Sequence, residues 1–172
     1  LNALQILDED HIEVKDMNGS WAGAMGQNQF MPSSFLNFAY DFDKDGRKDI
    51  WNTLPDIFAS SANYLSQSGW DDNLTWGREV IITKDIDESL ITTSAKKINI
   101  SKSLNEWSSL GVKKTNGHLL PNKNIQAYLV YPDGVKGKKY LVYDNFKVLM
   151  KWNRSLFFGI SVGTLSDMIE YF

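Results

Sequence analysis

The chain has 172 residues and a formal net charge of −3, and 42% of its residues are hydrophobic, which is enough for a packed core and excludes a disordered chain. It has no cysteine, so disulfides and thiolate metal sites are excluded. There is no basic stripe, no apolar run of membrane-spanning length and no signal peptide, which argues against nucleic acid as the main partner and against a transmembrane helix.

The first part of the chain is predicted to be helical. Leucines recur at near-helical spacing within residues 1–7, and Pro32 stands where a short helix can begin. A further helix is predicted over 55–68, with Ile57 and Phe58 on its inner face.

The middle of the chain favours strands. Residues 76–83 and 89–100 are rich in Ile, Val and Thr, which prefer extended structure. Ser103, followed three residues later by Glu106, resembles a capping box that opens a short helix. Within 127–143, two apolar runs flank a Pro-Asp-Gly turn, which predicts a β-hairpin.

Helical character returns over 145–152 and 156–172. The order therefore predicts an α+β chain whose mainly helical core is interrupted by a small β-rich lobe. We expect 1–72 to form part of the helical core, 73–144 the β-rich lobe, and 145–172 the helices that return to the core.

A loop of alternating aspartates predicts a calcium site. It matches the first, third, fifth, sixth, seventh and ninth positions of an EF-hand loop with Asp41, Asp43, Asp45, Gly46, Arg47 and Asp49. The twelfth position, a bidentate Glu in an EF-hand, is Asn52, and Asp56 is expected to close the site instead. We predict structural Ca²⁺ within 41–56, with the carbonyl of Arg47 as one ligand. The alternative is a solvated Asp-Gly turn.

Several short motifs occur in a characteristic order along nearly the whole chain. They are GSWAGAMGQNQFMPSSF (19–35), YDFDKDGRKDIWNT (40–53), SANYL (61–65), GW (69–70), WGREV (76–80), EWSSLGV (106–112), LVYPDG (129–134) and KWNRS (151–155). Together they resemble family B lytic murein transglycosylases.

The resemblance implies a lysozyme-like helical core with an inserted β-rich lobe and an EF-hand-like calcium site. It also implies cleavage of peptidoglycan between N-acetylmuramic acid and N-acetylglucosamine, with a 1,6-anhydromuramoyl product. One Glu serves first as acid and then as base, so a second carboxylate is not required. That Glu needs an apolar pocket to stay protonated near neutral pH.

The resemblance places the catalytic Glu upstream of the GSWAGAMG run. Only Glu9 and Glu13 precede Ser20, and neither has the family's catalytic context. We therefore assign no catalytic residue in this chain and expect it to be inactive by itself. Two interpretations stay open: a part of an enzyme that supplies the substrate groove, or a non-catalytic, calcium-stabilised module that binds peptidoglycan. A calcium-dependent interaction protein is a weaker third.

Substrate-binding residues follow from the family's motifs. They are Ser20, Gln29, Phe30, Met31, Tyr64, Trp152, Asn153 and Phe158. Ser20 is alternatively a turn serine, Phe30 and Met31 are alternatively core, and the helical position of Tyr64 equally allows a buried role. Trp152 and Phe158 stand where many members carry tyrosine, which keeps a stacking surface and loses the hydroxyls.

The expected partners and location follow from the same resemblance. Peptidoglycan glycan strands are the expected partner, and the expected location is the periplasm or cell envelope, with anchoring to the outer membrane through upstream sequence. No organic cofactor is expected. His11 and His118 lack partners at metal-ligand spacing and are predicted to be surface residues.

Overall fold

The computed structural model of the chain describes residues 1–169. These residues form two compact units, the first covering Leu1–Ser68 and the second beginning at Gly69. Of the helices described, none has both the length and the apolar composition needed to cross a bilayer.

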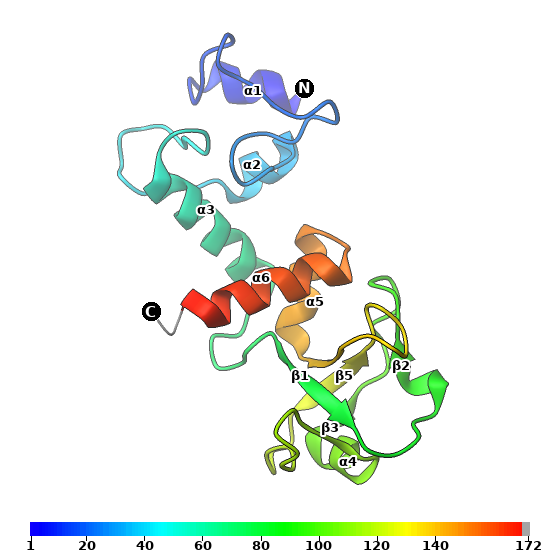
Figure 1. Cartoon of the computed structure of the whole chain (residues 1–172). Helices are drawn as coiled ribbons and strands as arrows, with labels where there is room; N and C mark the ends of the chain where they lie inside the picture. The colour runs from blue at the N-terminus through cyan, green and yellow to red at the C-terminus, as the bar shows by residue number, and fades with distance from the viewer. Residues whose placement is uncertain (170–172) are drawn as a thin grey trace. The chain divides into compact units, whose positions relative to one another are not determined.

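The first unit contains three helices joined by long loops (Figure 1). They are α1 (Asn2–Asp8), α2 (Pro32–Phe38) and α3 (Leu54–Gln67). A proline occupies the first turn of both α2 and α3, where its missing N–H costs no helical hydrogen bond. All three predicted helices are confirmed, and α2 contacts both α1 and α3.

The predicted inner face of α3 is only partly right. Ile57 is buried as expected, but Phe58 is 68% exposed. Asp56 and Ser60 are buried beside Ile57, and both hydrogen-bond to backbone amides of the preceding loop. Polar side chains therefore occupy the inner face, and Phe58 lies on the other side of the helix.

The prediction that His11 is a surface residue is wrong. Its side chain is buried, and its ring packs on Phe35 with centroids 5.4 Å apart. Nδ1 accepts a hydrogen bond from the Lys48 amide at 3.3 Å, and Nε2 lies 3.3 Å from Glu9. Desolvation, followed by the charge of Lys48, lowers the pKa of His11 below its ordinary value of 6.5. His118 is exposed, as predicted.

The second unit is built on a mixed sheet. Its strands are β1 (Gly77–Ile82), β2 (Ile91–Thr92), β3 (Lys102–Ser103), β4 (Val112–Lys114), β5 (Gln126–Val130) and β6 (Lys139–Val142). Their order is β2-β5-β6-β1-β4, and β3 also pairs with β5. The predicted hairpin is confirmed as the antiparallel pair β5 and β6, whereas β2 runs parallel to β5.

The long strand predicted over 89–100 does not form. A 3₁₀ turn, η1 (Glu88–Leu90), precedes the two-residue β2, and the stretch after β2 is irregular. The capping box is confirmed: Ser103 and Glu106 bond to each other's backbone amides at the start of α4 (Leu104–Ser109). Trp107 of α4 is fully buried and donates from Nε1 to the Ala127 carbonyl at 2.9 Å, which fixes the helix on the sheet.

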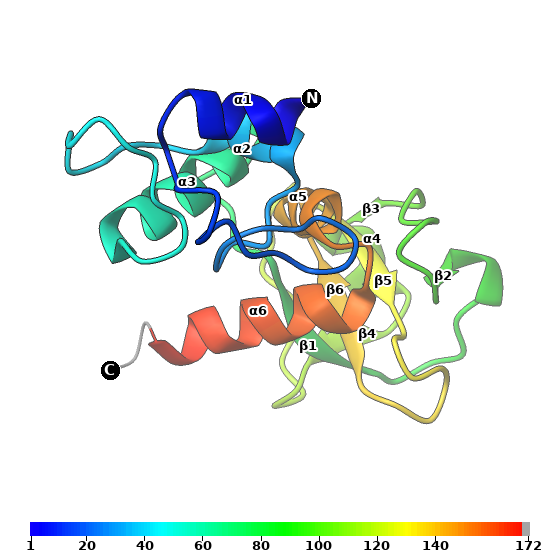
Figure 2. The ribbon, with the colours of Figure 1, turned by 90° about the horizontal axis from the view of Figure 1, so that it is seen from above.

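Two predicted helices follow the sheet, α5 (Asp144–Trp152) and α6 (Leu156–Ile169), which contact each other (Figure 2). The predicted continuation of the second helix over 170–172 lies outside the described residues. Two glycines of α6 allow the helix to pack closely against Phe146 and Trp76. A methyl group at Gly159 would overlap Phe146, and one at Gly163 would overlap the indole of Trp76. Trp76 in turn donates from Nε1 to Asp167 at 3.0 Å.

Buried Asn145 anchors the start of α5. Its Oδ1 accepts from the Asp71 amide at 2.9 Å, while Nδ2 donates to the carbonyls of Asp71 and Leu74. These bonds hold α5 in place, and with it the turn 153–155 that connects α5 to α6.

Candidate functional site

Ser20 lies in a tight loop of the first unit. Its amide donates to the Ala24 carbonyl at 2.8 Å, and its Oγ accepts from the Ala24 amide at 3.1 Å. Gly23 has a φ of +89°, a conformation that glycine adopts without strain. The loop thus holds the exposed Ser20 hydroxyl in a fixed direction, with its proton still available for donation.

Gln29 lies at the tip of the next turn. Its φ is +52° and its Nε2 donates to the Gly26 carbonyl at 2.9 Å, so a side-chain bond supports a backbone conformation that non-glycine residues rarely adopt. A methyl group at Gly26 would meet Ile50 at about 2.6 Å, which makes glycine necessary there.

Asn28, beside this turn, is a residue that the sequence analysis missed. It is buried, and its Nδ2 donates to the Ile57 carbonyl at 2.8 Å and to Ser61 Oγ at 2.7 Å, so it ties the turn to α3. Its Oδ1 has no hydrogen-bond partner within the described chain. Little in the sequence signals this role, because Asn28 stands between two other polar residues, Gln27 and Gln29.

Phe30, Met31 and Tyr64 differ in accessibility. Phe30 is 2% exposed and packs on the partly buried Tyr64, with ring centroids 5.7 Å apart. Tyr64 also meets Phe38 edge-on at 4.8 Å. Met31, by contrast, is 44% exposed. Phe30 therefore supports the surface from below, while Met31 presents apolar area; the predicted role of each in substrate binding stays a prediction.

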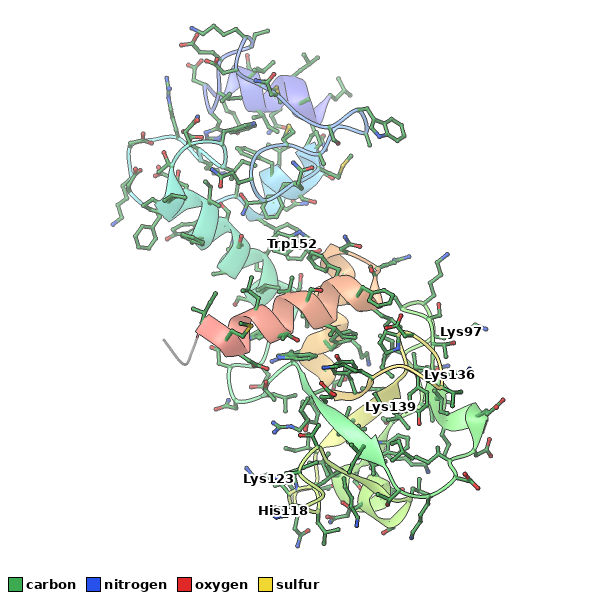
Figure 3. All side chains as sticks on the ribbon, in the orientation of Figure 1. Lys97, His118, Lys123, Lys136, Lys139 and Trp152 are labelled. Carbon is green, nitrogen blue, oxygen red and sulfur yellow. The ribbon has the colours of Figure 1, made fainter. Side chains whose placement is uncertain are left out.

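The second unit carries the other predicted binding residues around the turn between α5 and α6. Trp152, labelled in Figure 3, ends α5, and Asn153 follows in extended conformation. Asn153 is exposed, and no residue among 1–169 hydrogen-bonds its side-chain amide, which leaves a donor and an acceptor for a ligand. Phe158 is partly exposed in the first turn of α6.

The aspartate loop brings three carboxylates together. Asp41, Asp43 and Asp56 each offer an oxygen, and these oxygens lie within 4.8 Å of one another. Asp41 accepts from the amides of Lys44 and Gly46, and Gly46 has a φ of +93°. The loop thus folds around the first aspartate, and glycine makes its sharp turn, as an EF-hand loop requires.

The buried carboxylate of Asp56 closes this cluster from α3. Its two oxygens accept from the amides of Phe42 at 2.8 Å and Asp49 at 2.9 Å. Each oxygen keeps a further lone pair for a cation. The pKa of Asp43 is raised by desolvation and then by repulsion from Asp45, Asp56 and Asp41, which is the cost of gathering these charges.

The other predicted ligands lie outside the three-carboxylate cluster. Asp45 Oδ1 accepts from the Arg47 amide at 2.8 Å. Asp49 accepts from the Trp51 and Asn52 amides, both at 2.9 Å, and so caps the turn that leads into α3. The predicted roles of Asp45, Arg47 and Asp49 in metal binding stay predictions.

No glutamate among residues 1–169 is buried, so none of them has the apolar surroundings of a general acid. Glu9 accepts from Gln5 Nε2 at 2.7 Å, and this bond lowers its pKa. Glu13 pairs with Lys15 at 2.8 Å in solvent. The Gln5 contact thus favours the ionised form of Glu9, and Glu13 is exposed, so neither residue lies in the apolar pocket that a general acid requires.

Comparison with known proteins defines the class. Residues 1–167 match the family described as the transglycosylase SLT domain, and the chain belongs to that family. Over 55 residues it is 47% identical to membrane-bound lytic murein transglycosylase B of Escherichia coli (strain K12), a match that covers 32% of this chain and 15% of that protein.

Solved structures share the fold. SltB3 from Pseudomonas aeruginosa, in complex with NAG-anhNAM-pentapeptide, matches with a TM-score of 0.90 and 42% identity over 98% of this chain and 44% of its own. The Escherichia coli lytic transglycosylase SLT35, in complex with calcium, matches with a TM-score of 0.76 and 25% identity over 99% of this chain and 51% of its own. The chain therefore has the lysozyme-like lytic transglycosylase fold of helices and a mixed sheet, and it spans about half the length of these relatives or less.

Proposed function

We propose that this chain supplies the substrate-binding surface of a peptidoglycan lytic transglycosylase in the bacterial cell envelope. The observation that carries the proposal is the match to SltB3, whose complex holds NAG-anhNAM-pentapeptide, at 42% identity over 98% of this chain. The whole enzyme would cleave the MurNAc–GlcNAc bond and leave a 1,6-anhydromuramoyl end. Its location in the periplasm fits the relative named membrane-bound lytic murein transglycosylase B.

The side chains that we assign to the substrate have the chemistry that amino sugars require. Asn153 has a free amide for an acetamido group, and Trp152 and Phe158 offer ring faces for pyranose stacking. Ser20 presents a hydroxyl, with Gln29, Met31 and Tyr64 as further contacts and Phe30 beneath them. The general acid is not among the described glutamates, so these residues bind and orient the glycan.

We further propose that the aspartate loop holds a structural Ca²⁺. Asp41, Asp43 and Asp56 would be its carboxylate ligands, with Asp45, Asp49 and the Arg47 carbonyl as the remaining oxygens. All are hard oxygen donors, and the lysozyme-like relative SLT35 was solved in complex with calcium. The ion would offset the repulsion among the carboxylates and keep the loop rigid.

A non-catalytic module that binds peptidoglycan is the second candidate, because no described glutamate is buried. Incubation with purified sacculi separates the outcomes. The proposal expects the chain to sediment with sacculi, and Asn153→Ala to reduce the bound fraction, with exposed Asn116→Ala as a matched control. Failure to sediment would contradict both candidates.

Mass spectrometry of the soluble fraction then distinguishes the parts of the function. We expect this chain alone to release no anhydromuropeptides, and a longer protein that contains it to release them. If the longer protein also binds sacculi without releasing anhydromuropeptides, the chain belongs to a binding module.

A further inference from the structure

A concave pocket in the second unit lies outside the residues assigned above. Its volume is about 440 Å³, and residues of the irregular segment after β2 and of the end of α5 line it. Ala95, Ile98 and Met150 supply its apolar lining. These residues come from parts of the chain about fifty positions apart, so the pocket depends on the folded unit.

Every charged side chain that lines the pocket is cationic. They are Lys96, Lys147, Lys151 and Arg154. Lys147 is partly neutralised, since its Nζ lies 3.3 Å from Asp144 Oδ1 and 3.1 Å from the Tyr128 hydroxyl. Within residues 1–169, Lys96 and Arg154 have no ion-pair partner. Lys96 and Arg154 therefore give the pocket a positive potential that favours an anion.

The cationic and apolar side chains that line the pocket indicate which class of anion it fits. A guanidinium and an ammonium at one site suit a carboxylate, which the planar Arg154 fork can bind with two parallel hydrogen bonds. The apolar side chains beside them suit a short aliphatic group on the same molecule. A peptide that ends in a small residue carries both features.

The position of the pocket indicates where that peptide comes from. Lys151 and Arg154 flank Trp152 and Asn153, the two residues that we assign to the glycan. Figure 3 shows Trp152 and Lys97, from the two segments that border the pocket, within the second unit. The proposed glycan residues are therefore sequence neighbours of two of the cations that line the pocket.

We propose that this pocket binds a carboxylate of the peptide stem of peptidoglycan. The proposal rests on the proposed function, because the glycan must occupy the surface around Asn153. Lys96 and Arg154 would contact the carboxylate, and Ile98 and Met150 the adjoining aliphatic side chain. The pocket would thus select glycan that still carries its peptides.

Calorimetric titration tests the proposal with two sugar probes, NAG-NAM-pentapeptide and a NAG-NAM disaccharide without peptide whose lactyl carboxyl is capped as an amide, and with inorganic phosphate as a simple anion. The wild-type chain is expected to bind the pentapeptide probe more tightly. The double variant K96E/R154E should weaken that binding by about tenfold or more, and leave the disaccharide affinity unchanged. The matched control K114E/K123E makes the same change in net charge, and Lys123 lies well away from Lys97 in Figure 3.

The possible results separate the two proposals. If wild type binds neither probe, both are overturned. If it binds the two probes equally, or K96E/R154E and K114E/K123E behave alike, the pocket proposal fails while the proposed function stands. If K96E/R154E loses affinity for inorganic phosphate but not for the pentapeptide probe, the pocket is an anion site of another kind and the proposal is overturned.

Discussion

At the scale of single residues, the most informative side chains are those whose environment contradicts their residue type. His11, Asn28, Asp56 and Asn145 are all polar and buried. Each bonds backbone groups from a distant segment, so each joins two parts of its unit. Such a residue costs free energy if one partner is lost, because the other partner stays buried and unpaired.

His11 should make the stability of the chain depend on pH. Its neutral form accepts a hydrogen bond from the Lys48 amide, and protonation of Nδ1 would remove this bond. Burial and the charge of Lys48 oppose the charged form of His11, and they outweigh Glu9 and Asp41, which favour it. Because the folded pKa lies below 6.5, the stabilisation is present above pH about 6.5 and is lost as pH falls through the folded pKa. The melting temperature should therefore fall on acidification in this window.

The variant His11→Gln, which does not titrate, should flatten that part of the melting profile. The exposed His118→Gln serves as the control and should leave the profile of the wild-type chain unchanged. Equal slopes in His11→Gln and in wild type would show that other groups cause the pH dependence.

At the scale of elements, the packing of α6 depends on its glycines. Gly163→Ala would place a methyl group against the Trp76 indole, which is itself buried and bonded to Asp167. Overpacking of this kind costs about 1–3 kcal/mol. Denaturant unfolding should show the loss as a lower midpoint. Ser161→Ala, an exposed change on the same helix, should alter the midpoint little, and an equal midpoint in both variants would contradict the packing argument.

The elements also show what can be predicted from sequence. Local signals in the sequence predict α2, α3 and the start of α4 correctly. A proline in the first turn marks both α2 and α3, and the capping box of Ser103 and Glu106 marks α4. The long strand predicted over 89–100 does not form, because a strand also needs a pairing partner from another segment of the chain. Only Ile91 and Thr92 find a partner in β5, and the neighbouring polar residues have no strand to pair with.

In the candidate site, too, residues that are continuous in sequence could be predicted, whereas contacts between distant segments could not. The aspartate loop and the segment 151–155 are continuous in sequence, so their residues can be found from spacing and resemblance. The burial of Asp56 and His11 depends on contacts with Phe42 and Lys48, 14 and 37 residues away. The basic pocket was missed for the same reason, because residues 95–98 and the end of α5 lie about fifty positions apart and line one pocket only in the folded unit.

At the scale of the whole molecule, the two units differ in what holds them together. The second has a sheet with a continuous buried cluster around Trp107 and Leu129. The first relies on helices of 7, 7 and 14 residues and on long loops. Helices shorter than about 12–15 residues are marginal without tertiary support. The aspartate loop, which leads directly into α3, is therefore where a bound ion would add most to the stability of the chain.

Calcium should accordingly stabilise the chain, and the effect should arise in the first unit. At a Ca²⁺ concentration of 100 times Kd, binding to the folded state alone contributes about 2.7 kcal/mol. Calorimetric melting should show a higher melting temperature with Ca²⁺, and hydrogen exchange should slow at the amides of Lys44, Gly46 and Asp49, which bond the cluster's carboxylates.

Asp43→Asn is the sharpest test of this stabilisation, because Asp43 is the most exposed member of the cluster and its replacement removes one charge without emptying the core. The variant should fold and lose most of the calcium-dependent shift, whereas Asp85→Asn, an exposed aspartate in the second unit, should keep it. A chelator that leaves the wild-type melting temperature unchanged would remove the ion from the proposal. The cluster would then be a set of Asx turns, in which backbone amides alone offset the charge of the carboxylates.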